Sequence, residues 1–216
     1  MKLIIFSDLN MNLFLLSWNP DECARYHCNK HVVKMILELC QMLYTAHHEL
    51  NSTELANCQL TPYKSTHKNH PVTIWVRTNT ANYTYTCLVG IALCREYYQR
   101  YGYKKKSLQS FDITVAPTGR QHKCYEHFKW LSAHFPPTLP ISDTMTMPAL
   151  AMFDQFKIPN DPITSYRLFY RYNKAHFAKY PNDEYPDWWN SLQLFEWNGE
   201  LMIIDHIQRL IRPIRS

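Results

Sequence analysis

Glycine is scarce in this 216-residue chain, which holds 4 glycines against 15 tyrosines, 10 phenylalanines and 6 tryptophans. Neither the GxGxxG nor the GxxxxGK[ST] pattern occurs, and both need glycine to let the backbone approach a phosphate. The scarcity therefore argues against the two common nucleotide-binding folds. Low-complexity runs are absent as well, and 46% hydrophobic and 19% charged residues are typical of one globular domain at this length.

The chain also lacks a CxxC pair and any apolar run long enough to cross a membrane. Its 7 cysteines are an odd number without the spacing of a disulfide framework, which favours a reducing compartment. The opening apolar run ends at Phe6, too early for a signal peptide. We expect a soluble, intracellular protein without membrane contact.

Positive charge exceeds negative charge by a small margin, with 23 Lys and Arg against 18 Asp and Glu and a formal net charge of +5. This excess permits nucleic-acid binding but does not demand it, because dedicated binders often carry a stronger one. The basic residues gather at Lys104–Lys106, between Arg167 and Lys179, and between Arg209 and Arg215. The default interpretation of each group is a solvated surface.

The longest helical pattern runs from Asp21 to about His48, without an internal glycine or proline. Apolar residues at steps of three and four predict a core-facing stripe made of Val32, Met35, Ile36, Leu39, Met42 and Leu43. The neighbouring face carries titratable residues at similar steps, namely His27, Lys30, His31, Lys34 and Glu38. Two interpretations stay open for this face: a wall of an active site, or surface charge with an i,i+4 ion pair.

Two more long helices are predicted, from Pro71 to about Tyr101 and from Ile163 to about Tyr180, and a shorter one around His122–His134. Short apolar runs at Leu3–Phe6 and Leu13–Leu16 predict strands.

The Asn198-Gly199 pair predicts a hairpin near the C-terminus. The fold class is mainly α: a compact helical domain built on three long helices, with short β elements near the N-terminus and in a C-terminal hairpin. We divide the chain into an extension at 1–10, a single helical catalytic domain at 11–190, and a hairpin with a basic tail at 191–216.

Basic and aromatic residues alternate along the third helix, where Arg167, Arg171, Lys174 and His176 interleave with tyrosine and phenylalanine. This pattern suits a ligand with phosphates and bases, and it equally suits an amphipathic helix with a basic outer face. The candidate DNA-binding residues are Lys30, His67, His70, Trp75, Arg77, Arg167, Arg171, Lys174 and His176. Trp188 and Trp189 are further candidates for stacking on a base.

Several motifs occur together and in order: NKHVVKM at 29–35 with Glu38 and Gln41, THKNHP at 66–71 with Trp75, Glu96 with RYG at 100–102, and KAHF at 174–177. This set resembles a largely uncharacterised family of small proteins from phages and large DNA viruses. The resemblance implies a location in the host cytoplasm or the virion.

The stretch from His31 to Leu39, with the later histidine-proline and arginine-glycine elements, is also similar to pyrimidine-dimer DNA glycosylases of the phage endonuclease V type. This resemblance implies a DNA-acting glycosylase and AP lyase, with Glu38 as the catalytic carboxylate and no cofactor. The family uses its amino-terminal amine as the nucleophile. Met11 is an alternative start for this chain. With Met1 as the start, we expect a lysine to supply the amine, with Lys34 as the first candidate and Lys30 as the second. His31 completes the candidate catalytic set.

Two other functions stay open. Cys23, His27 and His31 follow at steps of four, and together with His67, His70 or His176 they would suit a metal-dependent hydrolase. Alternatively, the same surface serves a non-catalytic nucleic-acid-binding or host-interaction protein. We expect DNA as the partner and no metal, and we leave the oligomeric state open.

Overall fold

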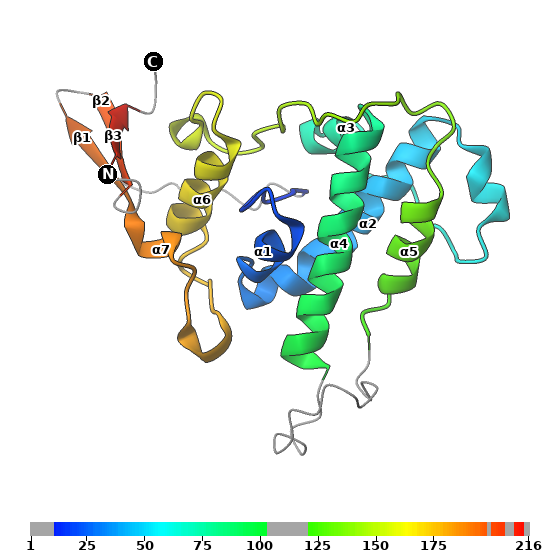
Figure 1. Cartoon of the computed structure of the whole chain (residues 1–216), viewed down its shortest axis with the longest axis horizontal. Helices are drawn as coiled ribbons and strands as arrows, with labels where there is room; N and C mark the ends of the chain where they lie inside the picture. Colours follow the sequence, from blue (N-terminus) through cyan, green and yellow to red (C-terminus); the bar gives the residue numbers. More distant parts are fainter. Residues whose placement is uncertain (1–10, 103–120, 198–199, 206–209, 214–216) are drawn as a thin grey trace.

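The structure is a computed structural model that describes residues 11–102, 121–197, 200–205 and 210–213. Within these ranges the chain forms seven α-helices and three strands (Figure 1). The helices are α1 (Pro20–Arg25), α2 (Asn29–Glu49), α3 (Pro71–Val76), α4 (Thr80–Tyr101), α5 (Tyr125–Ala133), α6 (Pro162–Asn173) and α7 (Trp188–Ser191). Short 3-10 helices lie at Thr53–Asn57, Asp154–Phe156 and Pro181–Asp183. The predicted mainly α fold class is confirmed.

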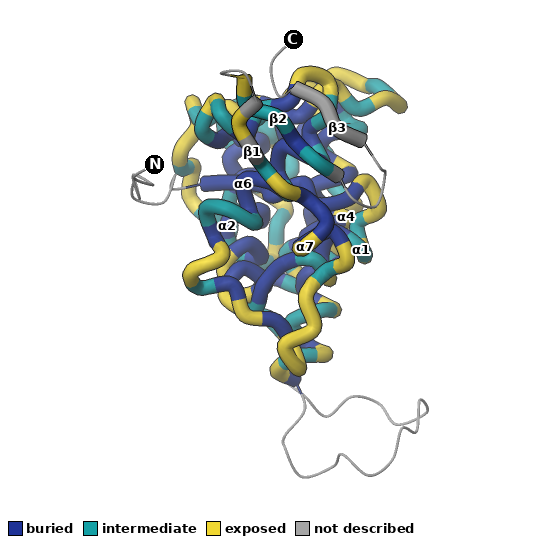
Figure 2. Tube along the Cα trace, turned by 90° about the vertical axis from the view of Figure 1, so that its left-hand side faces the viewer, coloured by how far each residue is buried: buried dark blue, intermediate teal, exposed yellow. Residues whose placement is uncertain are grey.

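Helix α4 contacts α1, α2 and α5, so these four helices form one packed group. Helices α6 and α7 lie on the other side of α1, and the sheet lies beyond them at the far end of the molecule (Figure 1). The predicted apolar stripe of α2 is confirmed, because each of its six residues is at most 1% exposed. Buried segments fill the middle of the molecule and exposed ones surround them (Figure 2).

Helices α4 and α5 approach closely at Gly90. A Cβ atom built at this position would lie 2.1 Å from Cε1 of Phe128, which is fully buried. Real Cβ atoms essentially never come so near to another heavy atom. Glycine is therefore required here for the contact between the two helices.

The predicted strand at Leu13–Leu16 is wrong, since residues 11–17 form no strand. The segment is nevertheless almost fully buried. Side chains from distant helices bind its polar backbone groups: Arg167 Nε donates to Leu16 O at 2.8 Å, and the Tyr85 hydroxyl donates to Ser17 O at 2.7 Å. These contacts replace the ladder of a sheet, which explains how an apolar run stays extended without a partner strand.

The first predicted helix is also wrong in one respect, because it breaks between Arg25 and Asn29. The guanidinium of Arg100 donates to Arg25 O at 3.1 Å, to His27 O at 2.9 Å and to the Asn29 side chain at 3.0 Å. It also forms a buried ion pair with Glu96, with 2.7 Å between Nε and Oε1. Arg100 on α4 thus binds the backbone groups that a continuous helix would have paired internally.

The second predicted helix breaks between Val76 and Thr80, again contrary to the prediction. The Asn79 side chain caps α4 by accepting from the N–H of Asn82, and the Asn82 amide donates to Trp75 O at the end of α3. The predicted helix start at Pro71 is confirmed, and the His70 side chain caps this helix. The third predicted helix begins at Pro162, one residue before the predicted start, and ends at Asn173 instead of about Tyr180. Turns after Asn173 bring Lys179 O to within 2.8 Å of Asn29 N.

The predicted C-terminal hairpin is confirmed, because β1 (Leu192–Trp197) pairs antiparallel with β2 (Glu200–Asp205). A third strand, β3 (Leu210–Pro213), extends the sheet on β2 and was not predicted. The predicted strand at Leu3–Phe6 and the basic group at Lys104–Lys106 lie outside the described residues. Among the described helices, none combines the length and apolar character that a membrane crossing requires.

Candidate functional site

Glu38 lies in the middle of α2 and is only 6% exposed, which is unusual for a carboxylate. Each of its oxygens has a donor. The backbone N–H of Asn12 donates to Oε2 at 3.0 Å, and Lys34 Nζ lies 3.2 Å from Oε1. The carboxylate is therefore held in one orientation by an extended segment on one side and by an amine of its own helix on the other.

Burial raises the pKa of the Glu38 carboxyl above its ordinary value. The positive charge of Lys34, the Asn12 N–H and the charge of His67 act in the opposite direction and are outweighed. A carboxyl in this state accepts a proton more readily than an exposed one does. This property suits a group that must take up and return protons during a reaction.

Lys34 is the exposed partner of this pair. Its side chain is 46% exposed, compared with 8% for the Glu38 side chain, so the amine is readily accessible while the carboxylate is mostly buried. The predicted i,i+4 pair is thus present, but it joins an accessible nitrogen to a buried acid. An ordinary surface ion pair would leave both groups exposed to solvent.

His31 lies one turn before Lys34 and is 4% exposed. Its ring stacks on Phe14, with 4.7 Å between the ring centroids and 7° between the planes. Its Nδ1 lies 2.9 Å from the hydroxyl of Tyr170. Burial, followed by the charges of His27 and three lysines, lowers the pKa of His31 to about 2, so the ring is neutral at physiological pH.

His27 is fully buried at the end of α1, where its Nδ1 lies 2.7 Å from Cys23 O. Burial lowers its pKa to about 4. Its Nε2 has no hydrogen-bond partner within the described structure. His27 therefore faces the core of the protein, behind His31.

His67 and His70 sit on the turn that leads into α3. His67 is exposed and adopts a positive φ of 46°, and its charge reaches Glu38. His70 is half-buried and caps α3, because its Nδ1 accepts from Val72 N–H at 3.3 Å. The structure therefore brings His67 toward the Glu38 face and assigns His70 a local contact in α3.

Two of the basic candidates lie beside the half-buried ring of Phe177. Lys30 Nζ lies 5.1 Å from its ring centroid, and the His176 ring lies 4.8 Å from it, edge-on. Lys174 is only 6% exposed, and its Nζ lies 5.2 Å from the Phe169 ring centroid. Since His31 also contacts Phe177, with 5.3 Å between centroids, this group adjoins the histidine end of the site.

The other predicted contact residues lie in the framework of the fold. Trp75 is 5% exposed, and its indole N–H donates to Thr146 O at 3.1 Å. Arg167 and Arg171 donate to Leu16 O and Trp189 O, and each guanidinium stacks on aromatic rings. Arg77 follows α3 and has one buried guanidinium nitrogen without a partner in the described structure. The structure does not bring these four residues to Glu38.

Trp188 and Trp189, which were candidates for base stacking, are 3% and 6% exposed. They pack against α6, where Tyr170 contacts both rings at 6.4 Å between centroids. Within the described ranges, no three His, Cys, Asp or Glu side chains come together as potential metal ligands. The cysteine and histidine spacing that suggested a metal site is therefore not matched by a cluster of ligands in that part of the chain.

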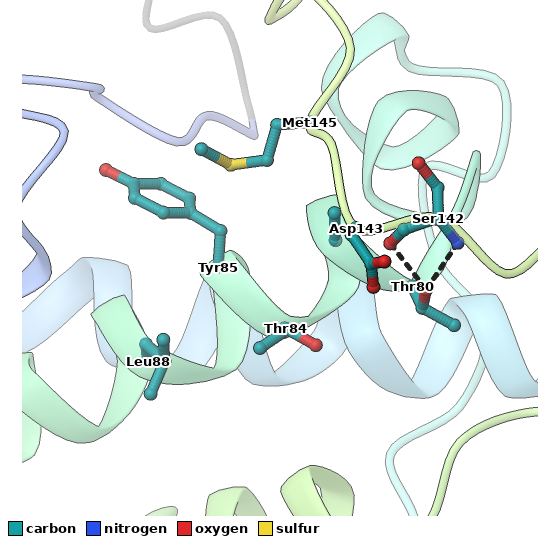
Figure 3. Close-up of a pocket in the computed structure, with 8 residues that line it drawn as sticks. Thr80, Thr84, Tyr85, Leu88, Ser142, Asp143 and Met145 are labelled. Atoms are coloured by element: carbon teal, nitrogen blue, oxygen red, sulfur yellow. Dashed lines mark hydrogen bonds between the residues drawn. The ribbon is translucent and has the colours of Figure 1, made fainter.

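A shallow depression of about 380 Å³ lies elsewhere, between α4 and the segment that follows Pro140. Thr80, Thr84, Tyr85 and Asp143 are among its lining residues, and two hydrogen bonds join Thr80 to Ser142 (Figure 3). It contains none of the predicted site residues. We therefore take the Glu38 face as the candidate site, because a buried carboxyl and an exposed amine lie together there.

Residues 11–110 match the model of the pyrimidine dimer DNA glycosylase family. The match covers slightly less than half of the 216 residues. It begins at the segment that donates to Glu38 and includes Lys34, Glu38 and His67, and it supports the second resemblance found in the sequence. No curated protein and no solved structure matches the chain significantly.

Two residues of this site were not found from the sequence. Asn12 lies in an apolar run with no signal of function, and Tyr170 reads as one of several aromatic residues of an amphipathic helix. Both act through contacts more than 25 positions away along the chain. No local pattern carries that information.

Proposed function

We propose that this protein is a DNA glycosylase for pyrimidine dimers, with an AP lyase step that uses an amine nucleophile. The proposal rests chiefly on the Glu38 carboxylate, which is buried with Lys34 Nζ at 3.2 Å from Oε1 and the Asn12 N–H at 3.0 Å from Oε2. The family match over residues 11–110 contains all three residues.

Lys34 is proposed as the nucleophile. Its nitrogen must lose a proton before it attacks, and the nearby Glu38, with its raised pKa, is the acceptor. The nitrogen lone pair then bonds to C1′ of the sugar while the bond from C1′ to the base breaks. The base leaves with the electrons of the bond that breaks and takes up a proton from solvent.

Glu38 is proposed to move the protons of the next steps. The nitrogen then gives its second proton to solvent, and its lone pair forms a C=N double bond as the bond from C1′ to O4′ breaks. The sugar ring opens, and O4′ takes the proton that the Glu38 carboxyl holds. Removal of a proton from C2′ then expels the 3′ phosphate and cuts the strand. Borohydride supplies hydride to the same C=N bond and converts it into a stable amine adduct.

The surrounding charge suits a phosphate backbone. Lys30 and His176 are exposed beside Phe177, Lys174 lies over the Phe169 ring, and His67 lies near enough to Glu38 for its charge to act on the carboxyl. Such an arrangement can hold the phosphates on either side of an extruded nucleotide. We propose these four residues as the DNA-binding part of the site.

A second amine competes with Lys34 for this role. The nitrogen of Asn12 lies 3.0 Å from the carboxylate, and in a chain that began at Met11 a free amine would lie within one residue of it. In the longer chain this nitrogen belongs to a peptide bond and cannot attack. The geometry therefore allows two nucleophiles, which differ in the peptide that carries the adduct.

Borohydride trapping on end-labelled duplexes tests the proposal, with undamaged, UV-irradiated and abasic DNA compared side by side. A covalent adduct with strand cleavage on UV-irradiated DNA is expected, and its loss in Lys34→Arg but not in Lys30→Arg would identify the amine. An adduct that maps to residues 11 or 12 would reject Lys34 and keep the glycosylase. Trapping on the abasic duplex alone carries little weight, because many amines give it. Binding without an adduct on any duplex would instead support a non-catalytic DNA-binding protein.

A further inference from the structure

Tyr170 joins α6 to the junction between α1 and α2. The side chain is fully buried, and its hydroxyl contacts two groups of that junction. The backbone N–H of Cys28 donates to the hydroxyl oxygen at 2.8 Å, and His31 Nδ1 lies 2.9 Å from the same oxygen. A single hydroxyl therefore bonds both the start of α2 and a residue of the candidate site.

The direction of the bond between Tyr170 and His31 follows from the available donors and acceptors. The Cys28 N–H can only donate, so the hydroxyl oxygen accepts that bond and its own proton needs another acceptor. An unprotonated imidazole nitrogen is a strong acceptor at 2.9 Å, whereas the thiol sulfur of Cys28, the other acceptor beside this hydroxyl, is a weak one. This pattern favours a hydroxyl proton directed at His31 Nδ1, which would leave the imidazole proton on Nε2.

The ring of His31 cannot reverse this arrangement by turning over. It stacks on Phe14, and the edges of Tyr170 and Phe177 contact it at 5.2 Å and 5.3 Å between centroids. With aromatic contacts on three sides, a flipped ring would lose its only hydrogen bond to Tyr170. The orientation and the tautomer are thus determined together.

We propose that Tyr170 is a positioning residue that holds His31 as the Nε2–H tautomer, so that His31 offers a neutral N–H donor to an anionic oxygen of the substrate beside Lys34. The inference rests on the proposed function for its biological meaning, since the substrate oxygen would belong to DNA. The tautomer itself does not depend on that function.

The charges around His31 agree with a neutral donor. The positive charges of Lys34 and Lys30 on α2 and of Lys174 at the end of α6 all disfavour a charged imidazole, and burial does so most strongly. The three lysines also create a positive potential that attracts an anionic oxygen. His31 therefore donates a hydrogen bond without supplying a proton to the reaction.

Nitrogen NMR on the full chain labelled at histidine tests the inference directly, because protonated and unprotonated ring nitrogens have well separated shifts. The expected result is protonated Nε2 and unprotonated Nδ1 for His31, unchanged between about pH 5 and 8. Protonated Nδ1 in the unaltered protein would overturn the proposal. This readout needs no substrate, so it stays informative even if trapping shows no glycosylase.

Two substitutions distinguish a role of Tyr170 in positioning His31 from a role in packing alone. Tyr170→Phe should give a mixture of His31 tautomers and lower the rate of borohydride trapping about two- to tenfold, as expected for one lost hydrogen bond. Tyr180→Phe is the matched control, since it removes another buried hydroxyl, which donates to Tyr26 O at 2.9 Å, and should leave His31 unchanged. A pure Nε2–H form in Tyr170→Phe would overturn the positioning role.

A second pair of variants applies if Tyr170→Phe does not fold. Gln at position 31 places an amide N–H near the Nε2 position, whereas Asn places one near Nδ1. His31→Gln should therefore retain more phosphate binding than His31→Asn, measured with inorganic phosphate by chemical-shift titration of the full chain. Equal loss in both variants would contradict the proposal.

Discussion

Replacing Glu38 by glutamine is the sharpest test of the site, because the change keeps the shape and removes the charge. A carboxylate that moves protons contributes about 10²–10⁴ to a rate. Glu38 is only 6% exposed, so water can hardly take its place, and we expect a loss in the upper part of that range. At about 1.4 kcal/mol for each tenfold change, this corresponds to about 4–5 kcal/mol of transition-state stabilisation.

The same substitution should not destabilise the protein. Since burial raises the pKa of Glu38, the folded protein holds this proton to a higher pH than the unfolded chain does. The charged carboxylate therefore lowers the free energy of unfolding at every pH above the ordinary carboxyl pKa. Glu38→Gln should be at least as stable as the unaltered protein at pH 7, and the difference should shrink toward a pH of about 4.3.

Glu96→Gln provides the matched control. Glu96 is the other well-buried glutamate with an ion pair in the described structure, and it accepts from Arg100 Nε at 2.7 Å. Glutamine keeps an acceptor but turns a charge-assisted bond into a neutral one, which should cost about 1 kcal/mol of stability. Because Glu96 pairs with Arg100, which binds the break between α1 and α2 and not the Glu38 carboxylate, its substitution should leave trapping nearly unchanged.

Single-turnover trapping on UV-irradiated duplex and urea unfolding, applied to both variants, give the two readouts. The expected pattern is opposite in the two: Glu38→Gln loses activity and keeps stability, and Glu96→Gln loses stability and keeps activity. Normal trapping by Glu38→Gln would refute the catalytic role of the carboxylate. A Glu38→Gln protein less stable than Glu96→Gln would refute the electrostatic reasoning.

Three further predictions concern the fold. Gly90→Ala should lower the free energy of unfolding by about 1–3 kcal/mol, because a Cβ would meet the Phe128 ring at 2.1 Å, and the urea midpoint measures this loss. Asn82→Ala should cost about 2–3 kcal/mol and expose the Thr146 amide to hydrogen exchange, since the Asn82 side chain bonds both Thr146 and the end of α3. Stability should fall with acid by about 1.4 kcal/mol per pH unit for each histidine that stays neutral when folded, from a pH of about 6.5 downward, because the unfolded chain then binds protons that the folded one refuses. Burial lowers the pKa of these histidines, and they are His27, His31 and His47.

The apolar spacing of α2 and the turn chemistry of the hairpin were sufficient to predict those elements. Steps of three and four leave only one way to bury the stripe from Val32 to Leu43, and Asn198-Gly199 suits a tight turn between two strands. The helix starts at Pro71 and, to within one residue, at Pro162 could also be predicted, because a proline preceded by a polar cap acts locally. These features depend on neighbours along the chain.

The helix breaks could not be read in the same way. Nothing between Arg25 and Asn29 interrupts a helical pattern, and the break exists because Arg100, over 70 residues later, binds the freed carbonyls. The extended run at Leu13–Leu16 has the same explanation, since its backbone partners come from α4 and α6. Long-range hydrogen bonds overrule local propensity in both places.

The candidate site shows the same division. The order of residues along the chain determined that Lys34 and Glu38 lie one helical turn apart and share a face with His31. Only the tertiary structure decided that Glu38 is buried while Lys34 stays open, that Asn12 supplies the second donor, and that Tyr170 bonds His31. The physical reason is that helical spacing sets which side chains are neighbours, whereas burial, and with it the pKa and the direction of each hydrogen bond, depends on what the rest of the chain packs against that face.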